Sequence, residues 1–121
     1  MSDLITEGII GAAIEVHKIL GPGLLECIYE DALCIELAQR KIEFQRQMSI
    51  DIVYKNCRIK GQRIDLLVAH EVVVEVKAVT NLAEVVMAQV LSYLKAARLK
   101  RALLINFGVP RLVDGIKRIS L

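Results

Sequence analysis

Long apolar runs, a dominant charge sign and paired cysteines are all missing from this 121-residue sequence. No apolar stretch approaches the roughly 18–20 residues that a membrane-spanning helix needs. The first ten residues carry an acidic residue at position 3 and no basic region before an apolar stretch, so they do not predict a secretory signal. The three cysteines show no C-x-x-C spacing, which argues against zinc and favours free thiols in a reducing compartment. These absences predict a cytoplasmic protein that binds no membrane.

Charge is nearly balanced, with 16 basic and 14 acidic residues and a net charge of +2. This value neither requires nor excludes a nucleic-acid partner. If the protein binds DNA, its positive charge has to be concentrated locally.

Apolar residues, in contrast, are abundant. They make up 55% of the chain, above the roughly 45–50% of ordinary soluble domains. This excludes disorder, and the length fits a single domain over residues 1–121. The excess has two explanations, which are a sheet buried on both faces or an interface between subunits.

The spacing of apolar residues divides the chain into helices and strands. Gly21-Pro22-Gly23 separates the first two helices, because neither residue type is favoured inside a helix. Asn81 and Glu84 are spaced as the start of the last helix. The order predicts an α/β sandwich whose penultimate strand joins the sheet by a crossover. We expect helices at residues 4–20, 24–40 and 82–98, and strands at 43–55, 59–68, 71–78, 101–107 and 116–120.

The two strands around His70 carry the most informative charges. A tight turn there places Asp65 opposite Glu75 and Arg63 opposite Lys77. Residues two apart on a strand share a face, so Asp65, Glu75 and Lys77 are expected to point the same way. The opposite, core-facing side is expected to carry Ile64, Leu66, Val68, Val72, Val74 and Val76.

Two carboxylates on directly opposite residues, whose Cβ atoms are about 4.5–5.5 Å apart, repel each other, and a hard divalent cation explains their placement. Mg²⁺ takes oxygen ligands and is often held by one or two carboxylates. Lys77 could then stabilise an attacking hydroxide or the charge developing on a phosphate. The alternative is a solvated charged end of the sheet, in which Arg63 and Lys77 neutralise the acids.

A set of ordered motifs resembles the PD-(D/E)XK nuclease superfamily and, within it, the GxxExxY proteins. The naming motif stands here as Gly23-Leu24-Leu25-Glu26-Cys27-Ile28-Tyr29. The runs RIDLLV, VVEVKAV, AQVLSYLKA and LLINFG are similar to that family as well. The likeness extends over roughly residues 5–119.

The resemblance implies a restriction-endonuclease-like α-β-β-β-α-β core with an extra N-terminal helix. It also implies hydrolysis of phosphodiester bonds in DNA with Mg²⁺, or alternatively Mn²⁺, as the cofactor. Gln89 and Tyr93 are similar to the Q-x-x-x-Y motif of recombination exonuclease domains. The implied metal ligands are Asp65, Glu75 and Glu26, and the implied catalytic residues are Asp65, Glu75, Lys77, Gln89 and Tyr93.

Tyr29, His17 and Arg63 are candidates for contacts with the substrate. The structural alternative for Tyr29 is a half-buried tyrosine, and for His17 it is a cap at a helix C-terminus. Arg63 could instead help to neutralise Asp65 and Glu75. Gln89 borders an apolar stripe and could be a satisfied structural amide, and Glu26 could simply cap its helix.

The competing function is a non-catalytic module that binds nucleic acid or protein and retains the nuclease fold. The weak basic field, an aromatic content of 4% and the lack of an appended binding domain keep this alternative open.

We also expect a homodimer formed through the C-terminal half, because residues 101–107 and the tail offer more aliphatic side chains than one small sheet needs. The alternative is that helices of the same chain cover both faces of the sheet. The tail residues in question are Leu112, Val113, Ile116, Ile119 and Leu121.

Overall fold

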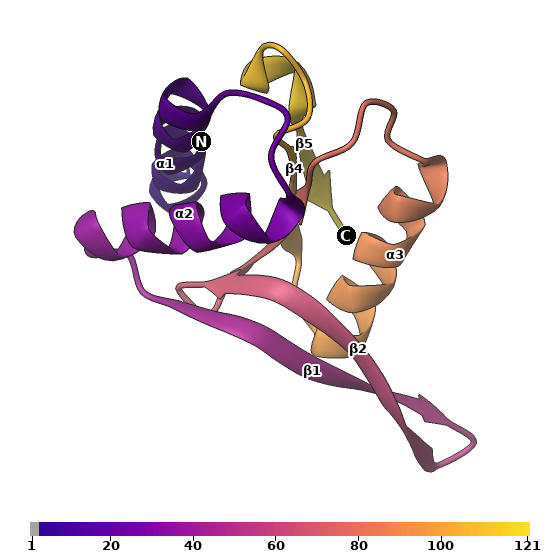
Figure 1. Ribbon diagram of the computed structural model, residues 1–121. Coiled ribbons are helices and arrows are strands. Elements are labelled where there is room, and N and C mark those ends of the chain that lie inside the picture. The colour runs from indigo at the N-terminus through magenta and orange to yellow at the C-terminus, as the bar shows by residue number, and fades with distance from the viewer. Residues whose placement is uncertain (1–2) are drawn as a thin grey trace.

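The computed structural model describes residues 3–121 and shows a five-stranded sheet with helices on both sides (Figure 1). Met1 and Ser2, which belong to the ten residues that were not expected to form a secretory signal, lie outside the described part. Within residues 3–121, no helix combines the length and apolarity needed to cross a membrane. The elements are α1 (Leu4–Leu20), α2 (Glu26–Gln39), β1 (Phe44–Tyr54), β2 (Cys57–Val68), β3 (Val72–Lys77), α3 (Glu84–Ala97), β4 (Arg101–Asn106), the 3₁₀ turn η1 (Leu112–Gly115) and β5 (Ile116–Ser120).

The strands lie in the order β1-β2-β3-β4-β5, and only β3 and β4 are parallel. The α3 crossover that connects β3 to β4 confirms the expected topology. A two-residue turn at 55–56 joins β1 to β2, and a three-residue turn at 69–71 joins β2 to β3. The φ angles are left-handed at Lys55, Asn56, Ala69 and His70. Paired left-handed residues match the twist of a hairpin, so these turns fix the register of three consecutive strands.

Helices of the same chain cover both faces of the sheet. One apolar cluster packs α1 and α2 against the sheet, and a second packs α3 against the other face. Residues 102–107 are all buried, because β4 lies inside the sheet and contributes to both clusters. The expectation that residues 101–107 leave apolar side chains free for a subunit interface is therefore wrong. The homodimer stays a prediction without this support.

Two expected helix starts are also corrected. Leu25 precedes α2 in an extended conformation, and Ala83 does the same for α3. Neither helix has a side-chain cap at its start, so the proposed capping by Asn81 and Glu84 is wrong. Helix α1 keeps the expected bounds, and the side chain of Asp3 caps it by accepting from the Thr6 N–H at 3.3 Å.

Strands β1 and β2 change the face that they present to the core at Gln47 and Asp65. Gln47 has a φ of 53°, and the register runs from Arg46↔Leu66 directly to Met48↔Ile64. Leu66 packs on the α1–α2 side, whereas Ile64 packs on the α3 side. The expectation that Ile64 shares a face with Leu66 is therefore wrong, because regular alternation stops between them.

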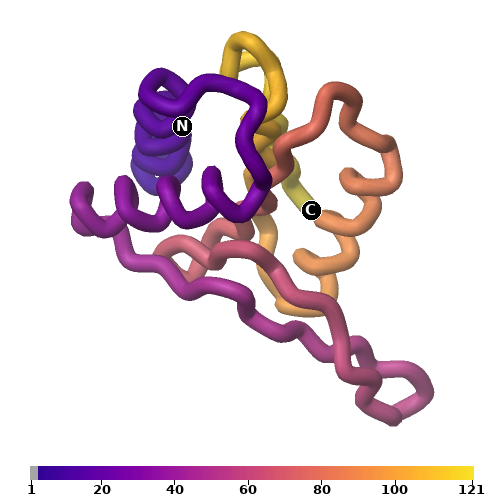
Figure 2. The backbone as a smooth tube through the Cα atoms, viewed as in Figure 1, coloured from indigo at the N-terminus to yellow at the C-terminus, as the bar shows by residue number. Residues whose placement is uncertain are grey.

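The outer part of the β1–β2 hairpin, residues 51–63, projects beyond the body of the molecule, and we call it the arm (Figures 1 and 2). Its register shifts between Ile50↔Gln62 and Ile52↔Ile59, which leaves two residues of β2 opposite Asp51. This bulge bends the hairpin. A Cβ on Gly61 would lie 1.5 Å from the Ile50 carbonyl oxygen, so the bend requires glycine.

Candidate active site

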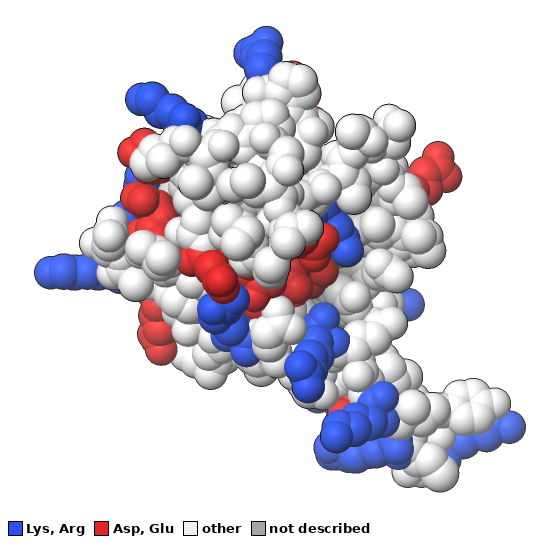
Figure 3. Space-filling view, in the orientation of Figure 1, with Lys and Arg blue, Asp and Glu red and all other residues white. Residues whose placement is uncertain are grey.

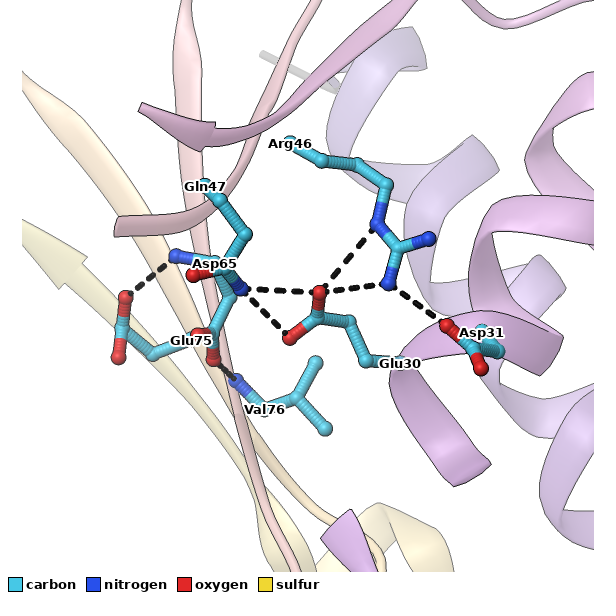
Figure 4. A network of polar contacts seen from close by, with 7 residues as sticks. All are labelled: Glu30, Asp31, Arg46, Gln47, Asp65, Glu75 and Val76. Carbon is cyan, nitrogen blue, oxygen red and sulfur yellow. Dashed lines mark hydrogen bonds and ion pairs between the residues drawn. The ribbon is translucent and has the colours of Figure 1, made fainter. Parts of the chain in front are cut away.

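The candidate site lies where β2 and β3 separate. Their backbone ladder ends at Leu66↔Val74. Beyond it, the Asp65 N–H donates to Glu75 Oε1 at 3.1 Å, and the Val76 N–H donates to Asp65 Oδ2 at 2.8 Å (Figure 4). Beyond the ladder, the two carboxylates therefore link the strands by accepting from backbone N–H groups, and the two acids face each other across the strands.

Burial makes both acids costly to ionise. It raises the pKa of Glu75 to about 7, the charge of Asp65 adds to this, and the Asp65 N–H and Lys77 oppose it. Burial also raises the pKa of Asp65 to about 6, against the Val76 N–H bond, while Glu30 and Glu26 add to the rise. Glu75 is only 5% exposed. A pair of crowded carboxylate oxygens is the donor set that a hard divalent cation prefers.

Lys77 and Tyr93 accompany the acid pair. Lys77, the last residue of β3, is half-buried, and its charge lowers the pKa values of both carboxyl groups. Burial raises the pKa of Tyr93, and the charges of Glu75 and Asp65 add to it, so α3 brings this side chain close to the pair. Gln89, one turn earlier on α3, is exposed.

The first turn of α2 adds negative charge on the other side of the pair. Glu26 is exposed at the start of the helix, and Glu30 follows one turn later and is buried. Within residues 3–121, no three His, Cys, Asp or Glu side chains form a group that could hold a metal ion. Glu26 is therefore near Asp65 and Glu75 without completing a three-carboxylate set.

A polar network joins α2 to Gln47, where β1 changes the face that it presents to the core. This network was not predicted from the sequence. Glu30 accepts from Arg46 Nη2 at 2.8 Å and from Gln47 Nε2 at 3.0 Å, and Arg46 Nη2 also donates to Asp31 at 2.7 Å (Figure 4). The network holds the left-handed Gln47 beside Asp65. Its one sequence signal was the four-residue spacing from Glu26 to Glu30, which places both on one side of a helix.

Asn106 is a second residue that the sequence analysis did not identify. It is 3% exposed and stands beside Lys77 in the parallel register of β3 and β4. Its Oδ1 accepts from the N–H groups of Val79 and Gly108 at 3.0 Å each, and its Nδ2 donates to the Val79 carbonyl at 2.9 Å. These bonds fix the backbone that leaves Lys77. A polar residue ending an otherwise apolar strand was the available signal.

Tyr29 was expected to contact substrate, and this is wrong. The side chain is fully buried, and its ring stacks on Phe107 with centroids 4.7 Å apart. Its hydroxyl donates to the Gly21 carbonyl and accepts from the Leu24 N–H at 3.1 Å. Gly21 and Gly23 have φ angles of 69° and 107°, which favour glycine. Tyr29 therefore holds the loop between α1 and α2.

His17 is corrected in the same way. It is 8% exposed, its Nε2 lies 2.9 Å from the Val109 carbonyl oxygen, and its ring centroid is 6.3 Å from that of Phe107. Its contacts join the end of α1 to the loop after β4, and this role replaces a substrate contact.

Arg63 is exposed on the arm, where its strand partner is Ser49. It does not stand opposite Lys77, because the β2–β3 ladder ends at Leu66↔Val74, three positions earlier. Its charge is also absent from the influences on Asp65 and Glu75. Neutralisation of the acid pair by Arg63 is therefore not what the structure shows.

Comparison with protein families matches residues 3–119 to the family described as the PD-(D/E)XK nuclease superfamily. No curated protein and no solved structure matches the chain.

Proposed function

Because this chain belongs to the PD-(D/E)XK nuclease superfamily, we propose that it is a Mg²⁺-dependent nuclease that hydrolyses phosphodiester bonds in DNA. The observation that carries the proposal is the pair of facing carboxylates, the half-buried Asp65 and the buried Glu75, with Lys77 beside them. The GxxExxY family is the finer assignment, on the Gly23–Tyr29 motif.

The donor set fits the cofactor, since Asp65 and Glu75 each offer anionic oxygens and ionise poorly without a cation nearby. When bound, Mg²⁺ supplies Lewis-acid activation of the attacking water and of the scissile phosphate, and Mn²⁺ suits the same oxygen ligands. Asp65 and Glu75 would hold the ion, and Glu26 would assist from the start of α2.

The remaining side chains act on the substrate and the water. Lys77 places a positive charge where negative charge develops on the phosphate, and it positions the attacking water. Tyr93 offers a hydroxyl from the α3 side, and the exposed Gln89 stands one turn away from it for a contact with the DNA backbone.

The proposal is tested by measuring DNA cleavage in Mg²⁺ and in EDTA, together with a calorimetric Mg²⁺ titration of the parent protein and of Glu75→Gln. We expect cleavage only with Mg²⁺ and a heat of binding that Glu75→Gln removes. Mg²⁺ binding without cleavage of any duplex or single strand would favour the non-catalytic module.

Lys77→Ala is expected to slow single-turnover cleavage by about 10²–10³-fold, because it removes a charge that acts mainly in the transition state. The affinity for Mg²⁺ should change little, since both oxygen ligands remain. Quenched-flow cleavage and calorimetry measure the two effects separately. Lys100→Ala, an exposed lysine beyond α3, serves as the control. A weakened affinity for Mg²⁺ with retained turnover would reverse the role assigned to Lys77.

Without metal, the free energy of unfolding is expected to fall as the pH rises from about 4 to about 7. The folded pKa values of Asp65 and Glu75, about 6 and about 7, exceed the unfolded values near 4. The folded state therefore binds more protons in this window, and raising the pH removes them at a cost. For the two groups together, the loss is on the order of 6 kcal/mol.

Urea unfolding in EDTA at pH 4.5 and pH 8 measures this effect. The double variant Asp65→Asn/Glu75→Gln is the control, because it retains every other titrating group. The parent and the double variant should differ in their pH dependence, and identical profiles would contradict the assignment.

A further inference from the structure

The arm is the part of the protein that carries its net positive charge. It holds four basic side chains and one acidic one, Asp51, for a net charge of +3, so the rest of the chain carries −1 of the overall +2. Every residue of the arm except Gly61 is exposed. The basic side chains are visible along the arm in Figure 3, next to a central hollow lined by acidic ones. They are Lys55, Arg58, Lys60 and Arg63.

These charges are largely free of carboxylate partners. Within residues 3–121, the arm has one ion pair, between Arg58 and Asp51 at 3.7 Å, and exposed pairs of this length contribute little. Lys55 lies 5.5 Å from the ring centroid of Tyr54. The side chains are thus available to another polyion.

If DNA is to approach the candidate active site, a positively charged element has to lie beside it. Asp65 and Glu75 lie close to Glu26 and Glu30, and this concentration of negative charge repels a polyanion such as DNA. Arg63 precedes Asp65 by two residues on β2. The arm therefore begins at the acid pair and leads away from it as a continuous basic ribbon.

The dimensions of the arm suit a duplex. Beyond Ile50↔Gln62, the strands continue for four residues of β1 and five of β2, which extends the ribbon by about 13–17 Å. The major groove of B-DNA is about 12 Å wide and admits a two-stranded β-ribbon. A groove between the arm and α3 adds one more basic residue. Its lining consists of Asp51, Ile52, Val53, Ser92, Lys95 and Ala96.

We propose that the arm binds the phosphate backbone of double-stranded DNA and places the duplex over Asp65 and Glu75. This inference rests on the proposed function and names the substrate class and the element that holds it. Single strands are less suited, because proteins that bind them stack bases on aromatic side chains. Tyr54 is the one exposed aromatic residue of the arm, and Tyr29 and Phe107 are buried.

A second copy of this chain is the competing partner, since Val53, Tyr54 and Ile59 are exposed on the arm. Two arms that met across a two-fold axis would oppose +3 to +3, which disfavours that contact. DNA, in contrast, complements the charge.

The test compares two triple variants that remove the same charge from exposed positions. Lys55→Gln/Arg58→Gln/Lys60→Gln alters the arm. Lys18→Gln/Arg111→Gln/Lys117→Gln alters α1, the loop before η1, and β5, which is the strand at the other edge of the sheet from β1. Fluorescence anisotropy with a labelled 24-base-pair duplex is followed from 50 to 200 mM salt in EDTA, so that no cleavage occurs. Circular dichroism checks the fold of each protein.

The arm variant is expected to bind at least about tenfold more weakly at 100 mM salt. Its salt slope should be smaller by about 2.7, because each phosphate that is no longer neutralised lowers the slope by about 0.9. The control variant should follow the parent. Equal slopes for the parent and the arm variant would overturn the inference, as would a changed sedimenting mass of the arm variant with unchanged duplex affinity.

These experiments distinguish an error in the inference about the arm from an error in the proposed function. If the parent cleaves duplex DNA in Mg²⁺ but the arm variant binds and cleaves equally well, the arm inference alone is wrong. If the parent neither binds nor cleaves DNA, both are wrong.

Discussion

Asp65→Asn and Glu75→Gln are each expected to lower the rate of Mg²⁺-dependent DNA cleavage by at least about 10²–10³-fold. Each change removes one anionic oxygen from the proposed metal centre. It also keeps an oxygen that can accept the existing backbone bond, from the Val76 N–H at position 65 and from the Asp65 N–H at position 75. The fold should therefore persist, and the loss should be chemical.

Single-turnover cleavage of a labelled duplex measures this effect. Glu7→Gln is a matched control, because Glu7 is exposed on α1. In EDTA at pH 8, both variants should also be more stable than the parent, since a poorly solvated charge has been removed. Cleavage at the parental rate by either variant would show that the centre has been placed wrongly.

Tyr29→Ala is expected to lower the free energy of unfolding by about 3–5 kcal/mol, the usual cost of removing a buried aromatic ring. The ring stacks on Phe107, and the hydroxyl bonds Gly21 and Leu24. Tyr29→Phe keeps the stacking and loses only these hydrogen bonds, for which we expect about 1–3 kcal/mol.

Urea unfolding of the two variants measures these costs, and cleavage by Tyr29→Phe decides the role of the residue. A core residue should leave the cleavage rate of Tyr29→Phe within a few-fold of the parent under folding conditions. A large loss of cleavage at unchanged stability would instead restore the substrate contact.

The order and topology of the elements could be predicted because they depend on local pattern. Apolar periodicity identified α1 and the strands, and the three-residue turn at 69–71, centred on His70, set the register of β2 against β3. The change of face at Gln47 could not be predicted, because nothing about a glutamine in a strand indicates a left-handed φ. The contact that holds it, with Glu30, comes from 17 residues away.

The residues of the candidate site likewise fall into those that the sequence predicted and those that it did not. The juxtaposition of Asp65 and Glu75 could be expected from a tight turn centred on His70, although the side chains meet where the regular ladder has already ended. Asn106 acts on Val79 across 27 residues, and no local spacing predicts such a bond. Tyr29 was misassigned because a residue three positions after Glu26 on a helix can face either the site or the core, and only the packing of Phe107 decides.

The exposure of the arm has a consequence for how this protein can evolve. Residues 51–60 are all exposed, so the outer hairpin adds almost nothing to either apolar cluster. Segments of this kind open and close locally, apart from the global unfolding of the core. Substitutions, insertions or deletions near Lys55–Asn56 can therefore alter which surfaces the protein binds, and how strongly, without drawing on the marginal stability of the sheet. The affinity for a partner and the stability of the fold can therefore be selected separately. Gly61 is the exception, because the bend of the arm requires glycine at this position.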